Sequence, residues 1–526
     1  MESEVALPEL GEIHEHRADP MQYITGKTEA LRVRKEEKDK FGEVFTPLKL
    51  INDMLDKLPA AIWSDPNKKW LDPATGIGNF PMMVYARLMN GLATYPDLTD
   101  QVIRSQHIIR RMIYMVELNP ESCARIRSIF GSAANLFCSS FLNQTIFTDG
   151  TTQFDVIVGN PPFNSDQTHQ GKKGGGSNLW PKFVEKSLDI MLAPRGYLLF
   201  VHPALWRKPP SDRARTLFDK MVHDNHMAYV EIHNKPDGFR DFRVHTRYDY
   251  YLIQNIRPTQ MRDFTTVKDQ LGMEHQLDLS RWRFLPNHSF ELIKPLLSDK
   301  EENYVIFSRG QYGSDKSWVS NSKDDEYNIP LVHSTPSNGP RFYWSSKKNE
   351  HCKGCKRMFD VLKVIFGESG INNAIIDYEG KYGMTQGAIG LKISREGEGE
   401  LMKSVLESKE FHRILDAMSF SNFRIDWRMF LYFRPDFYRH PQFVSRTPFL
   451  SKSVSKKQLK RAAAEAAEEE PSMSFVQSRG AQSSPRTLKS NSKRSKHESN
   501  QGGRKRNCRN FTKLRKRNSR YTRKKY

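Results

Sequence analysis

The stretch Phe154-Asp155-Val156-Ile157-Val158-Gly159-Asn160-Pro161-Pro162-Phe163 joins an apolar run to a stiff polar loop. A run of branched apolar side chains is typical of a strand that is buried on both faces of a parallel sheet. The prolines that follow restrict the backbone and cannot donate to a sheet or a helix. We therefore expect a buried strand over 154–159 and a rigid loop that begins at Asn160.

Similar short apolar runs alternate with helical spacing from Phe41 to about Asn255. This alternation is the sequence form of a parallel α/β sheet. The expected fold class is therefore α/β, with a Rossmann-like sheet of seven strands. The strands are predicted at 69–71, 113–118, 135–138, 154–159, 196–202, 228–233 and 248–254. The long interval between the first two predicts an added helix over 98–111.

Length and texture divide the 526 residues into four parts. Domains usually hold about 100–200 residues, so a chain of this length is expected to form two or three folded units. The predicted parts are an N-terminal arm at 1–40, the sheet domain at 41–255, a mixed domain at 256–445 and a tail at 446–526. The tail is poor in apolar residues and cannot offset the entropy of ordering, so we expect it to be disordered.

The positive charge is concentrated in that tail. Residues 446–526 hold 24 Lys and Arg against five Glu and no Asp, which is +19 of the whole-chain net charge of +21, so the first 445 residues carry only about +2. A basic balance confined to one end attracts polyanions such as DNA, RNA or an acidic surface. Basic clusters in the tail could also direct nuclear import.

Cysteine content and hydropathy indicate a soluble, intracellular protein, either cytoplasmic in a prokaryotic or viral setting or nuclear. The five cysteines are too few and too scattered for a disulfide framework, which favours a reducing compartment. No run of eighteen apolar residues occurs, so no membrane partner is expected. Cys352 and Cys355 have the spacing of half a zinc site, but no matching pair follows, so no metal is predicted.

Two further stretches end predicted strands with groups suited to a nucleoside-like ligand. Gly76 and Gly78 follow the strand at 69–71, where glycines allow a tight turn and close approach of the backbone to a ligand. Glu117 lies in the strand at 113–118, where a carboxylate can accept hydrogen bonds from both hydroxyls of a ribose. The simpler alternatives are that the glycines serve only a turn and that Glu117 begins a solvated loop.

The loop after the strand at 154–159 can orient an amino group. The amide oxygen of Asn160 and the carbonyl of Pro161 can each accept a hydrogen bond, and two acceptors draw the nitrogen of a planar amine toward a nucleophilic, tetrahedral geometry. Pro162 stiffens the loop, and Phe163 offers a flat face on which an extruded base could stack. The alternative is a rigid turn capped by a core aromatic residue.

These motifs and their order resemble the gamma-class amino methyltransferases of restriction-modification systems, which methylate the N6 amino group of adenine in DNA. The resemblance covers roughly residues 41–255. It implies that Asn160, Pro161, Pro162 and Phe163 form the catalytic motif. It also implies that S-adenosylmethionine is the cofactor and is bound by Phe45, Thr46, Pro47, Asp72, Pro73, Ala74, Gly76, Gly78 and Glu117.

Two positions of this chain bear on the expected contacts with the cofactor and the flipped base. The family usually carries an Asp after the strand at 135–138 that touches the adenine ring of the cofactor, whereas this chain has Ser139-Ser140-Phe141. Ser140 could hydrogen-bond there, and Phe141 could pack on the ring. A second aromatic residue sandwiches the flipped base in the family; Phe242 fits that position better than Phe239, although both could be core residues.

The resemblance implies sequence-specific binding of double-stranded DNA, with residues 256–445 as the target-recognition domain and room for a separate cognate nuclease as a partner. Lys172 and Lys173 lie in a glycine-rich loop after the catalytic motif and could reach phosphates, although the loop could equally be a surface insertion. Two other interpretations stay open. One is the same chemistry on an RNA guanine or a protein glutamine, and the other is a catalytically silent nucleic-acid-binding protein.

Overall fold

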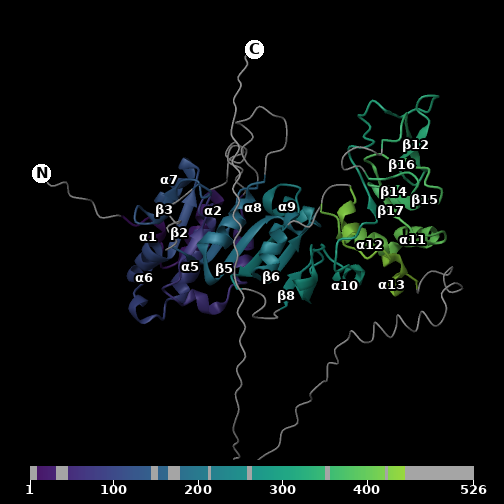
Figure 1. Ribbon diagram of the computed structural model, residues 1–526. Helices are drawn as coiled ribbons and strands as arrows, with labels where there is room; N and C mark the ends of the chain where they lie inside the picture. The colour runs from purple at the N-terminus through teal and green to yellow at the C-terminus, as the bar shows by residue number, and fades with distance from the viewer. Residues whose placement is uncertain are drawn as a thin grey trace, which may run out of the picture. The chain divides into compact units, whose positions relative to one another are not determined.

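Nine strands of the described chain form one mixed β-sheet, in the order β3-β2-β1-β4-β5-β7-β6-β8-β9 (Figure 1). The computed structural model describes residues 9–30, 45–143, 152–163, 178–210, 215–256, 264–349, 356–420 and 424–444, all within one unit, residues 1–459. The strands of this sheet are β1 (Trp70–Asp72), β2 (Ile113–Glu117), β3 (Asn135–Cys138), β4 (Phe154–Gly159), β5 (Leu192–Pro203), β6 (His226–His233), β7 (Tyr248–Gln254), β8 (Thr265–Lys268) and β9 (Glu274–Leu277).

Each of the seven predicted strands is present, but the predicted count of seven is wrong for the sheet. β8 pairs parallel with β6, and β9 pairs antiparallel with β8, so the sheet continues to Leu277. These two strands hold four residues each and follow one another without a helix. The strand–helix alternation that revealed the others therefore gives no sign of them. The predicted boundary at residue 255 falls inside the sheet.

The strands β3, β2, β1, β4 and β5 run parallel, whereas β7 is antiparallel to both β5 and β6. Parallel neighbours require crossover connections, and several of these are helical. The predicted helix over 98–111 is confirmed as α6 (Gln101–His107), which continues into the π-helical turn η3 (Ile108–Met112). Because parallel strands end at one edge of a sheet, the loops after β1, β2, β3 and β4 meet at that edge.

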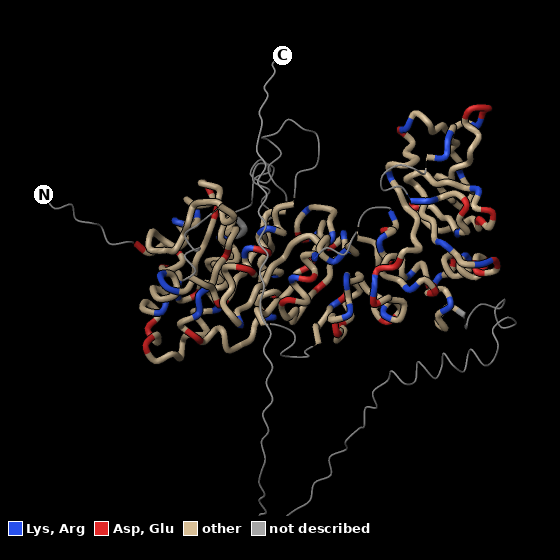
Figure 2. The backbone as a smooth tube through the Cα atoms, in the orientation of Figure 1, with Lys and Arg blue, Asp and Glu red and all other residues tan. Residues whose placement is uncertain are grey.

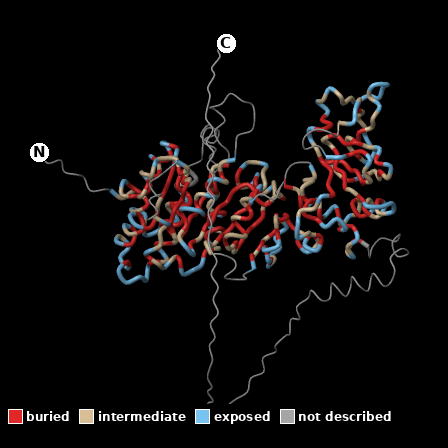
Figure 3. Tube along the Cα trace, viewed as in Figure 1, coloured by how far each residue is buried: buried red, intermediate tan, exposed pale blue. Residues whose placement is uncertain are grey.

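Helices and short helical turns accompany the strands of this sheet, and Figure 3 shows the strands as largely buried. Their bounds are α4 (Leu48–Leu55), η1 (Ala60–Trp63), α5 (Asn79–Gly91), η2 (Pro96–Leu98), α6 (Gln101–His107), η3 (Ile108–Met112), α7 (Pro120–Phe130), α8 (Trp180–Lys186), η4 (Ser187–Met191), η5 (Ala204–Arg207), η6 (Asp219–His223) and α9 (Lys235–Phe242).

The described part of the predicted N-terminal arm is packed into the sheet's helical layer. It forms α1 (Glu12–Glu15) and α2 (Pro20–Ala30). Ile13 and Ile24 are fully buried in the same apolar cluster as α4 and α5. The backbone of Gly11 lies so close to Gly131 that an added Cβ would be 2.4 Å from its nitrogen. Residues 9–30 are therefore not a separate arm.

Residues after 277 contain two more four-stranded sheets, with orders β10-β17-β14-β15 and β11-β13-β12-β16. The predicted mixed texture of this region is present, together with short helices. The strands are β10 (Val305–Ile306), β11 (Val319–Ser320), β12 (Ile329–Ser334), β13 (Arg341–Ser345), β14 (Lys363–Gly367), β15 (Gly370–Asp377), β16 (Gly383–Met384) and β17 (Ala388–Lys392). The helices and turns are η8 (Leu279–Arg281), α10 (Phe290–Ile293), η9 (Lys294–Leu296), α11 (Glu398–Leu406), α12 (Lys409–Ala417), η10 (Trp427–Leu431), η11 (Phe437–Arg439) and α13 (Pro441–Val444).

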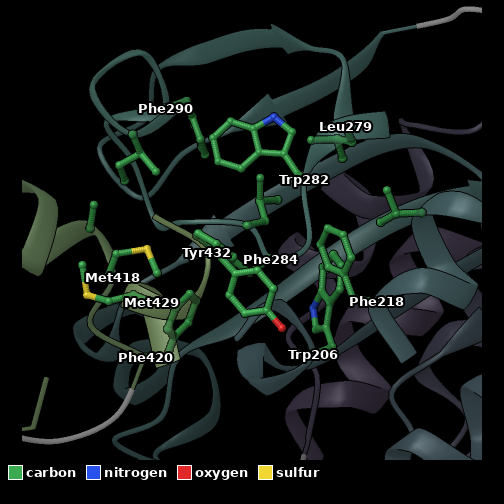
Figure 4. Close-up of a cluster of buried hydrophobic side chains, with 14 of the residues drawn as sticks. Trp206, Phe218, Leu279, Trp282, Phe284, Phe290, Met418, Phe420, Met429 and Tyr432 are labelled. Atoms are coloured by element: carbon green, nitrogen blue, oxygen red, sulfur yellow. The ribbon is translucent and has the colours of Figure 1, made fainter. Parts of the chain in front are cut away.

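A buried ion pair connects the end of η5 to β7 and to the chain after β9. Arg207 and Asp249 are both fully buried, and the guanidinium donates to both carboxylate oxygens, at 2.7 and 3.0 Å. The same guanidinium donates to the carbonyl of Leu285 and to the side chain of Asn287. Trp206, Trp282 and Tyr432 belong to the apolar cluster drawn in Figure 4, which joins these segments.

Some predictions fall outside the described residues. These are the disordered tail at 446–526 and the half zinc site at Cys352 and Cys355. Within the described ranges, no group of three or more His, Cys, Asp or Glu side chains is arranged to hold a metal ion. None of the helices described here is both long enough and apolar enough to cross a membrane.

Removing one partner of the Arg207–Asp249 pair should strongly destabilise this junction. Replacing Asp249 with alanine leaves a buried guanidinium without its counter-charge, so we expect the free energy of unfolding to fall by about 3–5 kcal/mol. Urea unfolding followed by circular dichroism measures this. Lys49→Ala, which removes an ion pair with an 87% exposed lysine side chain, serves as the control and should leave the unfolding midpoint unchanged. Equal midpoints for Asp249→Ala and wild type would contradict this account.

Candidate functional site

The carboxyl ends of four parallel strands carry most of the predicted site residues. Asp72 ends β1, Glu117 ends β2, Ser140 and Phe141 follow β3, and Asn160 follows β4. β1 lies between β2 and β4 in the sheet. The structure therefore brings the glycine stretch, the acidic residue and the Asn-Pro-Pro-Phe loop to one edge.

The loop after β1 has a backbone conformation that suits glycine. Gly76 and Gly78 have φ angles of 57° and 95°, and Gly78 caps the start of α5. No atom lies within 4 Å of a Cβ built on Gly76, so the loop borders open space there. The amide of Thr75 donates to the carbonyl of Val116 at 3.0 Å, which fixes the loop to β2.

Glu117 is held against this loop by backbone amides. One carboxylate oxygen accepts from the amide of Gly76 at 2.6 Å, and the other accepts from the amide of Asn119 at 2.7 Å. Burial raises the pKa of the Glu117 carboxyl above its ordinary value, and these hydrogen bonds oppose that rise. The next residue, Leu118, is 60% exposed although it is large and apolar. An exposed leucine directly after the buried acid leaves an apolar side chain open to solvent at this end of β2.

Asp72 is a second buried carboxyl at the same edge. Its Oδ1 atom accepts from the amide of Ala74 at 3.1 Å, and its Oδ2 atom is buried with no hydrogen-bond partner among the described residues. Burial raises the pKa of Asp72 well above its ordinary value, and the charge of Glu117 raises it further. A Cβ built on Gly159 would lie 2.8 Å from Oδ1, so only glycine allows β4 to approach this closely.

The stretch Phe45-Thr46-Pro47 contacts the loop after β4 and the start of α5, which follows the loop after β1. Thr46 is buried, and its hydroxyl accepts a hydrogen bond from the side-chain nitrogen of Asn160 at 3.0 Å. The side chain of Asn79 donates to the Thr46 carbonyl at 3.1 Å. Phe45 and Pro47 are half-buried on either side, and Pro47 precedes the first turn of α4. Three segments distant in sequence are thus joined by two hydrogen bonds.

The Asn-Pro-Pro-Phe loop ends on an aromatic contact. Phe163 is 8% exposed and meets Phe242, at the end of α9, edge to face with centroids 6.2 Å apart. Phe239 is 44% exposed and stacks on His245. The structure therefore brings Phe242 to the loop. Its role as a base-stacking residue stays a prediction.

The segment Ser139-Ser140-Phe141, which follows β3, packs against the core through Phe141. Phe141 is 2% exposed and stacks on Phe183 with centroids 5.3 Å apart, while Lys186 donates to the Phe141 carbonyl at 2.6 Å. The Phe141 side chain is therefore already covered by the core. Its contact with a cofactor ring stays a prediction. Ser140 is half-buried beside it. Lys172 and Lys173 lie outside the described residues.

Sequence reasoning missed three features of this edge. Asn79 begins α5, and its buried side chain donates a hydrogen bond to the Thr46 carbonyl. Leu118 is exposed although it is apolar. Its place at the end of the strand predicted at 113–118 was the signal that could have pointed to it. Cys123 and Cys138 form a disulfide between α7 and the end of β3, with Cα atoms 6.0 Å apart. Their spacing of 15 residues gave no indication of this contact.

Comparison with known sequences finds similarity over part of the chain. The family described as Eco57I restriction-modification methylase matches residues 105–239, which contain Glu117 and Asn160. A relative from Mycoplasma pneumoniae, named as an uncharacterized adenine-specific methylase, is 23% identical over 288 residues, covering 40% of this chain and 67% of the relative. The chain is thus similar over part of its length to restriction-modification methylases.

Among solved structures, two similar proteins also come from restriction-modification systems. The Type IIL enzyme MmeI in complex with DNA matches with a TM-score of 0.46 and 9% identity, over 75% of this chain and 68% of that one. The M protein of the Type I restriction enzyme EcoKI matches with a TM-score of 0.33 and 16% identity, over 43% of this chain. The chain spans about half the length of the EcoKI M protein that it matches, at 48%.

The buried Asp72 carboxyl predicts a specific pH dependence of stability. A pKa raised by folding means that the folded state binds the proton more tightly, so the free energy of unfolding should fall as pH rises above about 4 through the raised pKa. Asp72→Asn keeps an oxygen for the Ala74 amide and cannot ionise. We expect the variant to gain stability relative to wild type as pH increases from 4 to 8, measured by urea unfolding at each pH. Parallel curves for the two proteins would contradict the prediction.

Proposed function

We propose that this chain transfers a methyl group from S-adenosylmethionine to the N6 amino group of adenine in DNA. The observation that carries the proposal is the hydrogen bond from Asn160 to Thr46, which joins residues 114 positions apart. It holds an amide side chain beside the glycine loop and the buried acid of β2. An amide oriented in this way suits the recognition of an amino group.

The residues at this edge fit the proposed cofactor. Gly76 borders open space, Glu117 would accept hydrogen bonds from the ribose hydroxyls, and the exposed Leu118 would offer an apolar surface for a ring. Asp72 adds a buried oxygen that lacks a hydrogen-bond partner among the described residues. When bound, S-adenosylmethionine supplies an electrophilic methyl group. Phe45, Thr46 and Pro47 would lie toward its methionine end, and Pro73, Ala74 and Gly78 would complete the turn around it.

The Asn160 loop would then prepare the target nitrogen. Because the side-chain nitrogen of Asn160 donates to Thr46, its oxygen is the atom that a target amine would meet. The Pro161 carbonyl is proposed as the second acceptor, with Pro162 keeping the loop rigid and Phe163 stacking on the extruded base. The methylated amine becomes acidic and loses its proton to water, so positioning supplies most of the acceleration.

Adenine in double-stranded DNA is the proposed substrate, and two sequence comparisons support this choice. The Mycoplasma relative is named an adenine-specific methylase, and the family matching residues 105–239 is a restriction-modification methylase. The region after the sheet, up to about residue 445, is proposed to recognise the target sequence. Site-specific methylation of this kind leaves room for a separate nuclease as a partner. The alternatives are an RNA guanine or protein glutamine acceptor and a silent nucleic-acid binder.

The central test is transfer of labelled methyl from S-adenosylmethionine to unmethylated DNA, with RNA in parallel, followed by nucleoside analysis. We expect label in N6-methyladenine from DNA. Asn160→Ala should abolish this label, because the amine loses a principal acceptor, while calorimetry still shows cofactor binding. Asn135→Ala, which removes a half-buried amide that bonds only main-chain carbonyls at the far end of β3, is the matched control and should retain activity.

Each other outcome of that assay is informative. Label in RNA alone would favour the guanine acceptor, and cofactor binding without label in either nucleic acid would favour a protein acceptor. Absence of cofactor binding by the wild-type chain would leave only the silent binder. Any of these would overturn the adenine assignment.

The Thr46 hydroxyl predicts a positioning effect on the rate. Thr46→Val removes the acceptor for the Asn160 amide without changing the side-chain shape, so the amide is no longer held in one orientation. We expect the single-turnover rate at saturating cofactor to fall about tenfold to a hundredfold. Thr46→Ser restores the hydroxyl and should restore the rate. If serine and valine behave alike, the hydroxyl does not orient Asn160.

A further inference from the structure

A polar pocket is lined by residues that do not belong to the Asn160 loop, and the sequence analysis did not predict it. It has a volume of about 90 Å³, several times the space that one water needs. Four cationic side chains and two carboxylates dominate its lining, together with Ile425 and Trp427. The charged residues are Lys208, Arg309, Glu368, Arg424, Asp426 and Arg428. Figure 2 shows Lys and Arg interspersed with Asp and Glu along the described chain.

The carboxylates of this pocket are buried and hold the cations in place. Glu368 is 6% exposed and accepts from Arg309 at 3.4 Å and from Arg424 at 3.2 Å. The two guanidinium side chains are 66% and 59% exposed. Each guanidinium has five N–H donors, of which Glu368 occupies one. Both arginines therefore present oriented donors to a ligand from solvent.

Asp426 organises the other side in the same way. It is 7% exposed, receives two hydrogen bonds from Arg428 at 2.7 Å and lies 3.5 Å from Lys208. The Ile425 amide donates to the Glu368 carbonyl at 2.7 Å, which joins the two halves of the pocket. Four cations against two carboxylates leave a net charge of about +2. The ligand that this charge favours is an anion.

An aromatic pair stiffens one wall. Trp427 stacks on Phe307 with centroids 5.1 Å apart and an interplanar angle of 21°. The guanidinium of Arg309 lies 5.8 Å from the Phe307 ring centroid, over the same ring. Rigid packing of this kind lowers the entropy that the arginine loses on binding a ligand. The donors are thus preorganised for a planar or tetrahedral oxyanion.

The pocket is connected to the edge of the sheet that carries Asn160. Lys208 directly follows η5, which follows the carboxyl end of β5, and β5 pairs parallel with β4 up to Gly159. The residue before it is Arg207, which is fixed in the buried pair with Asp249. A polymer that places one of its bases at the Asn160 loop therefore continues along the edge from which Lys208 projects.

We propose that Arg309, Arg424 and Lys208 bind a backbone phosphodiester of the DNA substrate in this pocket. This inference rests on the proposed function, since DNA is the anion that would extend from the Asn160 loop. A phosphodiester carries one negative charge and two exposed oxygens that match the forked donors of arginine. A contact to phosphate carries no base information, so the pocket sets the position of the duplex and not its sequence preference.

The test compares DNA binding by Arg309→Gln and Arg424→Gln in the full chain loaded with cofactor. Each single variant leaves Glu368 one arginine partner, so no buried carboxylate is stranded. Fluorescence anisotropy with duplex DNA should show affinity about tenfold weaker or more. The slope of log affinity against log salt should decrease by about one, and the loss should be equal for target and non-target duplexes.

A matched control and an independent readout accompany these variants. Arg357→Gln removes an arginine of equal exposure, 66%, whose carboxylate partner Asp360 is also exposed, and it should bind DNA as wild type does. Cofactor affinity measured by calorimetry should be the same in all the proteins. Wild-type affinity and salt slope in both pocket variants would overturn the inference.

Methyl transfer by the wild-type protein is measured in the same series. It separates a failure of the proposed methyltransferase function from a failure of the pocket assignment alone. If wild type methylates DNA and the pocket variants match it in affinity and slope, only the pocket assignment fails. If wild type neither binds nor methylates DNA, both fail. The last measurement is the binding of inorganic phosphate to wild type and to the pocket variants. Saturable phosphate binding that is lost in the variants, with DNA binding unchanged, would assign the pocket to a free anion and overturn the DNA assignment.

Discussion

The close approach of β4 to β1 is the constraint on which the candidate site depends. The two strands pair in parallel register, with Leu71 opposite Ile157, so their carboxyl ends reach the same edge. At that edge only a glycine at position 159 clears the Asp72 carboxylate. The residue after it, Asn160, can therefore reach Thr46, and the loop that is proposed to orient an amine lies beside the loop that borders open space. A larger residue at 159 would separate these two loops.

That arrangement opposes stability. Asp72 and Glu117 are buried carboxyls at adjacent strand ends, and burial raises the pKa of both. Burying a charge costs free energy unless hydrogen bonds compensate, and the backbone amides of Ala74, Gly76 and Asn119 supply only part of that compensation. The apolar strands on which these loops stand offset the rest. Groups kept at such a cost are characteristic of functional sites.

The sequence predicted what is local and missed what depends on distant contacts. The strands β1 to β7 were visible because each apolar run identifies itself, and Gly76, Glu117 and Asn160 were visible because each ends such a run. β8 was not visible in the sequence, because its four residues form a strand only by pairing with β6. The burial of Ile13 and Ile24 depends on α4 and α5, which no pattern within residues 9–30 reveals. The pocket around Glu368 draws on positions 208, 309, 368 and 424, so only folding brings its charges together.

The buried Arg207–Asp249 pair fixes the chain next to Lys208 of the pocket against β7 of the sheet. Buried ion pairs contribute little net stability when both partners are present, but they tolerate few alternative geometries, because a displaced charge would be left unpaired. Arg207 satisfies that requirement with β7 on one side and with Leu285 and Asn287 on the other. Lys208, the next residue, then has a fixed starting point and meets Asp426 from the far end of the described chain. A cation placed by such a junction is held at a defined position along the sheet edge, which a flexible surface lysine would not be.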